Sequence, residues 1–194
     1  HTIANHLKGL GYSTACIGKW HLGHLPELLP RQQGFDSYYG IPYSNDMNHP
    51  DNKNKPKISS DERWTNQASA ITHWNTPLIG NEEIIELPVD QRTITRRYTD
   101  KAVEFITANK ENPFFLYLPH LAIHFPWQGP KDPPQRTAGK NWHKDKWGII
   151  PDPDNVAPHV KAMIESLDTS VGEIVAALKK WQITNNTVVI FTSD

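Results

Sequence analysis

Short apolar runs alternate along this chain with amphipathic helical patterns, and this alternation limits the folds open to it. Runs rich in β-branched and aromatic residues occupy 12–17, 114–118 and 187–192. Because apolar residues fill successive positions in these runs, they are typical of strands that are buried on both faces of a sheet. The alternation predicts an α/β fold with a mostly parallel sheet flanked by helices.

Each run follows a predicted helix. The first helix lies in residues 1–11, and helices over 91–109 and 160–181 precede the other two runs. Apolar positions repeat at helical spacing in all three segments. The predicted buried faces are Ile3, His6, Leu7 and Leu10; then Ile94, Tyr98, Ala102, Phe105 and Ile106; then Met163, Ile164, Leu167, Val171, Ile174, Val175 and Leu178.

Two long segments without a regular pattern lie between these elements, at 22–90 and 119–157. The second is rich in proline and tryptophan. Long loops in a compact domain are usually functional, and tryptophan-rich loops are seldom disordered. We therefore expect both segments to wall a binding cleft.

Composition excludes several classes of protein. Lys and Arg number 20 against 21 Asp and Glu, so no strong overall field attracts nucleic acid or an anionic membrane. No apolar run reaches the roughly 18 residues that a membrane span needs. Cys16 is the single cysteine, which excludes a disulfide within the chain and a cysteine-rich metal site. The sequence begins without Met and ends where a strand should pass into a loop, so we expect further sequence on both sides.

Charged and proton-carrying residues follow each predicted strand. Lys19 and His21 come after the first, His120 and His124 after the second, and Asp194 after the third. In an open parallel sheet the ligand site lies beyond the carboxyl ends of the strands. Lysine and histidine suit an anionic oxygen, and aspartate suits a hard divalent cation. This arrangement predicts transfer of a phosphoryl-like or sulfuryl-like group.

The motif GYSTACIGKWHLGH resembles a signature of the type I, formylglycine-dependent sulfatases of the alkaline phosphatase-like superfamily. The resemblance continues through QGFDSYYGIPYSND, YTDKAVEFITANKENPFFLYLPHLAIHFP and AMIESLDTSVGEIVAALKKWQITNNTVVIFTSD. It implies that residues 1–194 are part of a sulfatase catalytic domain with a divergent insertion at about 47–88. The implied fold is the alkaline phosphatase-like α/β domain.

The resemblance implies a role for five residues. Lys19 and His21 match the lysine and histidine that contact sulfate and the formylglycine, and Ser44 matches a serine of the sulfate pocket. His124 matches the histidine of the A-P-H-x-P pattern, although Ile123 replaces its proline. Asp194 matches a calcium ligand. We expect His124 to protonate the leaving alcohol and His21 to orient the nucleophile, but the sequence alone does not separate these two roles.

The family nucleophile is a Cys or Ser in C/S-x-P/A-x-R, and no such string occurs here. Cys16 lacks the required neighbours, so we interpret it as a buried strand residue. We therefore expect the formylglycine, most calcium ligands and the C-terminal part of the domain to lie outside this chain. The 194 residues alone are predicted to be inactive.

Three functions stay open. The resemblance favours hydrolysis of an aryl or carbohydrate sulfate, so the implied partner is a sulfated small molecule or a sulfated glycan. The alternatives are a phosphomonoester or phosphonate hydrolase of the same superfamily and a non-catalytic protein that binds sulfated glycans. The resemblance implies a secreted, periplasmic or lysosomal location.

Other noticeable residues have simpler interpretations. His120, His143 and His159 are expected to be surface or loop histidines. The indoles of Trp127, Trp142 and Trp147 suit stacking on sugar or aryl rings, and they suit equally well the apolar anchoring of a long loop.

Overall fold

A computed structural model of the chain describes residues 1–45, 76–133 and 155–193. Its centre is a five-stranded sheet in the order β4-β3-β2-β1-β5. β1 pairs in parallel with β2 and with β5, whereas the β2–β3 and β3–β4 pairs are antiparallel. The strands are β1 (Ser13–Ile17), β2 (Ser37–Gly40), β3 (Leu78–Gly80), β4 (Glu83–Glu86) and β5 (Phe114–Tyr117). The α/β class is confirmed, and the sheet is mixed, with parallel pairing in its β2-β1-β5 half.

The described helices are α1 (Ile3–Gly9), α3 (Ile94–Ala108) and α4 (Ala157–Lys180). Short 3₁₀ turns lie at η1 (Pro26–Leu28), η2 (Pro30–Gln33), η3 (Gln91–Thr93) and η5 (Thr184–Asn186). The predicted strands at 12–17 and 114–118 and the predicted helices at 91–109 and 160–181 are therefore confirmed. In the described part of the chain no helix is long and apolar enough to cross a membrane.

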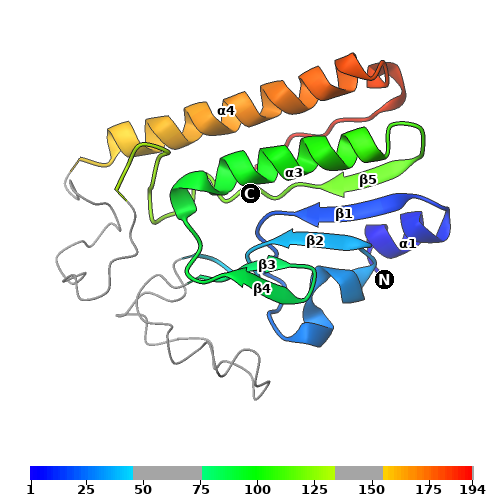
Figure 1. Ribbon diagram of the computed structural model, residues 1–194, viewed down its shortest axis with the longest axis horizontal. Helices are drawn as coiled ribbons and strands as arrows, with labels where there is room; N and C mark the ends of the chain where they lie inside the picture. Colours follow the sequence, from blue (N-terminus) through cyan, green and yellow to red (C-terminus); the bar gives the residue numbers. More distant parts are fainter. Residues whose placement is uncertain (46–75, 134–154, 194) are drawn as a thin grey trace.

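Side chains of β1 alternate between two apolar clusters, as the period of a strand requires. Ala15 and Ile17 pack with Tyr98 of α3 on one face of the sheet. Cys16 packs with Ala4 of α1 on the other face. Figure 1 shows α3 lying along the sheet and α4 lying beside α3. The interior strand β1 is thereby covered on both faces, as its sequence predicts.

α4 is held mainly by α3. Ile106 of α3 packs with Ala177 and Leu178 of α4 in a third apolar cluster. Arg96 of α3 forms an ion pair with Glu173 of α4 at 2.5 Å. Only part of the predicted apolar face of α4 is buried; Ile164, for example, is 48% exposed. The reason is that α4 packs against the rest of the described structure on one side only.

The prediction of a strand at 187–192 is wrong. Residues 187–193 form no strand, and the side chains of Val188 and Ile190 are 86% and 81% exposed. β5 is also only half-buried, because it lies at an edge of the described sheet. Apolar content predicted burial here, but burial requires a neighbouring layer that the described residues do not provide at this position.

The predicted face of the first helix is also wrong. Ile3 and Leu10 are exposed, and Ala4 is the buried residue of α1. The helix starts at Ile3, where Thr2 and Asn5 form a reciprocal capping box. Because α1 has only 7 residues, it buries a single side chain against the sheet, that of Ala4.

Three strands were missed in the segment 22–90, which we expected to be irregular. β2 is only 4 residues long and β3 only 3, so neither gives a clear periodic signal. Residues 76–88 of the predicted insertion contain the β3–β4 hairpin of the same sheet. The remainder of the insertion, from 47 to 75, lies outside the described residues.

Candidate functional site

The chain leaving β1 is bound on both sides by the chains leaving β2 and β5. The Gly18 amide donates to the Tyr39 carbonyl at 2.9 Å, and the Lys19 amide donates to the Pro119 carbonyl at 2.8 Å. Further on, the His21 amide donates to the Pro42 carbonyl at 3.1 Å. The carboxyl ends of the three parallel strands therefore meet at one edge, where the topology of an open parallel sheet predicts a ligand site.

Two glycines make this close approach possible. A β-carbon at Gly40 would lie 1.8 Å from the Gly18 carbonyl oxygen. A β-carbon at Gly18 would lie 2.1 Å from the Pro119 oxygen, and Gly18 has a φ of +143°. No side chain fits at either position, so both glycines keep the three chain segments in backbone contact.

Lys19 and His21 flank a buried tryptophan. The Trp20 indole is buried, donates to the Leu28 carbonyl at 2.8 Å and packs edge-on against Phe35. This anchor fixes the turn that leaves Lys19 half-buried and His21 exposed. His21 has a φ of +59°, a conformation that L-residues seldom adopt and that is often found at functional sites.

Ser44 and His124 come into direct contact. Ser44 Oγ lies 3.2 Å from His124 Nε2, although the two residues are 80 positions apart. His124 Nδ1 lies 2.5 Å from the Phe125 carbonyl oxygen, which can only accept a hydrogen. We therefore assign the proton of the neutral ring to Nδ1, which leaves Nε2 to accept from the Ser44 hydroxyl. When the ring is protonated, both nitrogens donate.

A buried amide fixes the chain at Ser44. Asn45 is 1% exposed, and its Nδ2 donates to Oε1 of Gln91 at 2.6 Å. The Asn45 carbonyl accepts from the Thr76 hydroxyl at 3.2 Å. Since Ser44 itself is only 2% exposed, these bonds hold its hydroxyl against His124 in a buried setting.

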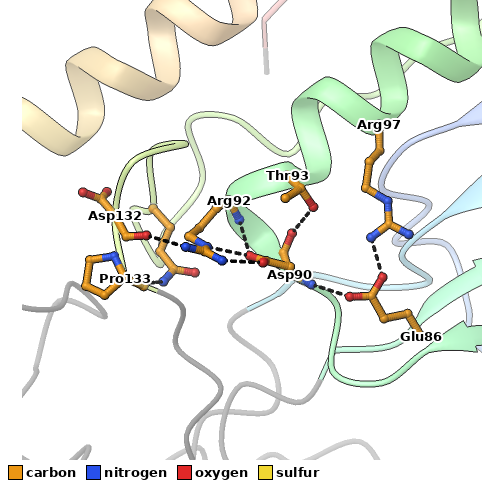
Figure 2. Close-up of polar contacts among 8 residues, drawn as sticks. Glu86, Asp90, Arg92, Thr93, Arg97, Asp132 and Pro133 are labelled. Atoms are coloured by element: carbon orange, nitrogen blue, oxygen red, sulfur yellow. Dashed lines mark hydrogen bonds and ion pairs between the residues drawn. The ribbon is translucent and has the colours of Figure 1, made fainter.

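The loop that carries His124 is tied by Arg92 to η3, the turn that leads into α3, as Figure 2 shows. Arg92 Nη1 donates to the Asp132 carbonyl at 3.1 Å, and its Nη2 forms an ion pair with Asp90 at 2.8 Å. Asp90 in turn accepts the Arg92 amide and caps the turn at the start of α3. The far end of the loop is thereby joined to η3, the same turn whose Gln91 anchors Asn45.

The same loop is tied to α4 at two points. Asp132 Oδ2 pairs with His159 Nδ1 at 2.8 Å, and it accepts the Gly129 amide at 2.6 Å. At the near end, His120 Nε2 lies 3.3 Å from Ser170 Oγ. Of the three histidines expected at the surface or in loops, His120 lies in this loop and His159 lies on α4, and both contact neighbouring polar side chains. His143 lies outside the described residues.

His120 lies at the end of a buried polar chain. Ser170 Oγ is 2.6 Å from the Thr99 hydroxyl, which donates to the Thr95 carbonyl at 2.7 Å. Burial removes the His120 imidazole from water and lowers its pKa to about 4. The ring is therefore neutral near pH 7, and its Nε2 forms a hydrogen bond with Ser170 of α4.

The structure places four of the five predicted site residues. Ser44 and His124 are in contact. Lys19 and His21 lie on the segment after β1, which is hydrogen-bonded to the segment that leads to Ser44 and to the segment that leads to His124. Asp194 lies outside the described residues. Among the residues that are described, no group of three or more His, Cys, Asp or Glu side chains could hold a metal ion. Cys16 is buried in the sheet, as predicted, and burial raises the pKa of its thiol.

Sequence analysis missed two contributors to this edge. Asn45 anchors Ser44, and Tyr43 packs edge-on against His24 with ring centroids 5.8 Å apart. Tyr43 lies within the GIPYS motif and Asn45 directly follows it, but a polar residue that is buried looks the same in sequence as one that is solvated.

Comparisons with known proteins point to one family. The Sulfatase family profile matches residues 1–194. Arylsulfatase G of Rattus norvegicus is 42% identical over 134 residues, which are 64% of this chain and 26% of that protein. N-acetylgalactosamine-6-sulfatase of Mus musculus is 30% identical over 200 aligned residues, covering 100% of this chain and 32% of that protein. The chain thus spans about a quarter to a third of the length of these relatives.

Solved structures give the same assignment. The crystal structure of Ps i-CgsB superimposes with a TM-score of 0.61 and 28% identity, over 95% of this chain and 38% of that one. The same protein in complex with k-i-k-neocarrahexaose gives a TM-score of 0.59. The match of the family profile over the whole length, together with these relatives, establishes that the chain belongs to the sulfatase family.

Proposed function

We propose that this chain supplies the sulfate-binding part of the active site of a sulfate ester hydrolase. The observation that carries the proposal is the contact of Ser44 Oγ with His124 Nε2 at 3.2 Å, at the edge where Lys19 and His21 also lie. This edge offers a cation, a hydroxyl and imidazoles, and such groups suit a tetrahedral oxyanion.

Each side chain has a distinct part in the proposed reaction. Lys19 provides a positive charge for the nonbridging oxygens of the sulfate as charge builds up on them. Ser44 donates its hydroxyl or accepts from His124, according to the protonation of the ring. A protonated His124 passes its Nε2 proton from the hydrogen bond with Ser44 to the leaving oxygen, and Nε2 then accepts again from the Ser44 hydroxyl. His21, which is exposed on its turn, orients the attacking group.

Two groups expected from the family lie outside the described residues. A formylglycine would supply the nucleophile for the sulfur atom, and its motif does not occur in this chain. Calcium is the proposed metal, with Asp194 as a ligand. Among the described residues, no three His, Cys, Asp or Glu side chains lie close enough together to form a calcium site.

We propose a sulfated carbohydrate as the substrate and a secreted, periplasmic or lysosomal location for the protein. Support for the substrate comes from two similar proteins. One is named an N-acetylgalactosamine-6-sulfatase, and the other, Ps i-CgsB, was solved in complex with k-i-k-neocarrahexaose. The alternative functions are hydrolysis of a phosphate or phosphonate monoester and binding of a sulfated glycan without turnover.

The test measures binding of methyl sulfate and methyl phosphate to the 194-residue chain by calorimetry. The proposal expects methyl sulfate to bind more tightly, and Ser44→Ala to weaken that binding. Tighter binding of methyl phosphate would favour the phosphate hydrolase, and binding of neither ester would contradict the proposal.

Calcium is tested separately by titrating the metal into the chain and into a complete sulfatase that carries this sequence. The chain should bind calcium weakly or not at all, and Asp194→Asn should weaken binding in the complete protein. Equal binding by the complete protein and its Asp194→Asn variant would remove Asp194 from the metal site.

A further inference from the structure

The loop after β5 exposes an apolar surface next to His124. Ile123 is 45% exposed, and Phe125 and Trp127 are half-buried. Pro126 and Gln128, which alternate with them, are buried and line a pocket against α3 and α4. The loop therefore directs Pro126 and Gln128 inward. Ile123, Phe125 and Trp127 form an apolar surface that we call the aromatic ridge after its two rings.

The orientation of the ridge is fixed by contacts within the loop. Trp127 Nε1 donates to the Ile123 carbonyl at 3.1 Å, and this hydrogen bond joins the two ends of the segment 123–127. The Phe125 and Trp127 rings lie edge to face with centroids 5.9 Å apart. Phe125 also lies beside the imidazole of His124, with centroids 6.5 Å apart. A fixed aromatic surface binds a ring with little loss of side-chain entropy.

From this arrangement we infer that the aromatic ridge binds the sugar ring that carries the sulfate, by stacking of its C–H face. The inference rests on the proposed function, since it takes the Ser44–His124 contact as the sulfate site. Hydrogen bonds of the loop to Arg92 of η3 and to Ser170 of α4 fix both ends of the segment that carries the ridge and His124. Selectivity for a sulfated sugar over a simple alkyl sulfate would then reside in Trp127 and Phe125.

The experiment compares two sulfate esters on the 194-residue chain, N-acetylgalactosamine 6-sulfate and methyl sulfate, by calorimetric titration. Wild type should bind the sugar sulfate more tightly. Trp127→Ala should weaken binding of the sugar sulfate by about tenfold, and it should change binding of methyl sulfate by less than about twofold. Trp127→Phe, which loses the indole N–H but keeps an aromatic face, should retain most of the difference.

Two control variants separate the ridge from the sulfate site. Ser44→Ala should weaken both esters alike, and Trp181→Phe, near the C-terminal end of α4, should affect neither. Thermal unfolding establishes that each variant is folded. If Trp127→Ala weakens both esters equally, or neither, the aromatic ridge does not bind sugar, and the proposed function stands. If wild type binds neither ester, the proposed function and this inference both fail.

Discussion

Lys19 is the residue on which the proposed chemistry depends most directly. In a complete sulfatase that carries this sequence, Lys19→Ala should lower kcat/KM by far more than tenfold, because it removes charge that stabilises the transition state. Hydrolysis of a chromogenic aryl sulfate measures the loss. Lys179→Ala, at an exposed position of α4, is the matched control. A loss below about tenfold, roughly 1.4 kcal/mol, would remove Lys19 from the catalytic role.

His120 makes stability depend on pH. Its pKa is about 4 in the folded chain against an ordinary value of 6.5, so the unfolded state binds more protons between these values. The free energy of unfolding should therefore fall as the pH drops from 6.5 to 4, by up to about 3 kcal/mol. Urea unfolding of wild type and His120→Gln across this range measures the difference.

The variant His120→Gln keeps a polar group near Ser170 but does not titrate, so its loss of stability on acidification should be smaller. His6→Gln, on the exposed side of α1, serves as the control and should behave like wild type. Parallel curves for wild type and His120→Gln would show that protonation of His120 does not oppose folding.

The junction of β1, β2 and β5 depends on glycine. Gly40→Ala should destabilise the chain by about 2 kcal/mol or more, because its β-carbon would meet the Gly18 backbone at 1.8 Å and the backbone must shift. Gly172→Ala provides a matched control within α4, where a β-carbon meets nothing within 4 Å. That change should stabilise the helix by roughly 0.5–1 kcal/mol.

Denaturant unfolding measures both glycine variants. Equal effects at Gly40 and Gly172 would mean that the three chains do not approach as closely as described. A loss confined to Gly40 should be accompanied by weaker binding of methyl sulfate, since the segments that lead to Lys19 and Ser44 both start at this junction.

Taken as a whole, the described structure leaves one apolar segment uncovered. Val188, Val189, Ile190 and Phe191 all expose more than half of their side-chain surface. Contiguous apolar surface of this kind favours association between molecules. Replacing Val188 and Ile190 with Thr should therefore reduce self-association, and it should change the free energy of unfolding by no more than about 0.5 kcal/mol per site.

Sedimentation velocity and denaturant unfolding test this expectation on the double variant Val188→Thr/Ile190→Thr. A loss of 2 kcal/mol or more would mean that the segment is buried in solution, as its sequence suggests. Unchanged association would show that another surface joins the molecules.

The sequence alone determined the elements whose signal is local. α3 and α4 were predicted from apolar repeats within a single segment, and β1 and β5 from short apolar runs, because the periods of helix and strand are fixed by the backbone. The motifs, through their resemblance to the sulfatases, also predict Lys19, His21, Ser44 and His124 as site residues.

Only the tertiary structure decided which of these pieces meet. The contact of Ser44 with His124 spans 80 residues, and β1 finds one partner at Ser37 and another at Phe114. Burial of Asn45 and His120 and exposure of Val188 likewise depend on which layers surround them. Periodicity within a segment carries no information about such distant neighbours, since pairing and burial are set by the packing of the whole chain.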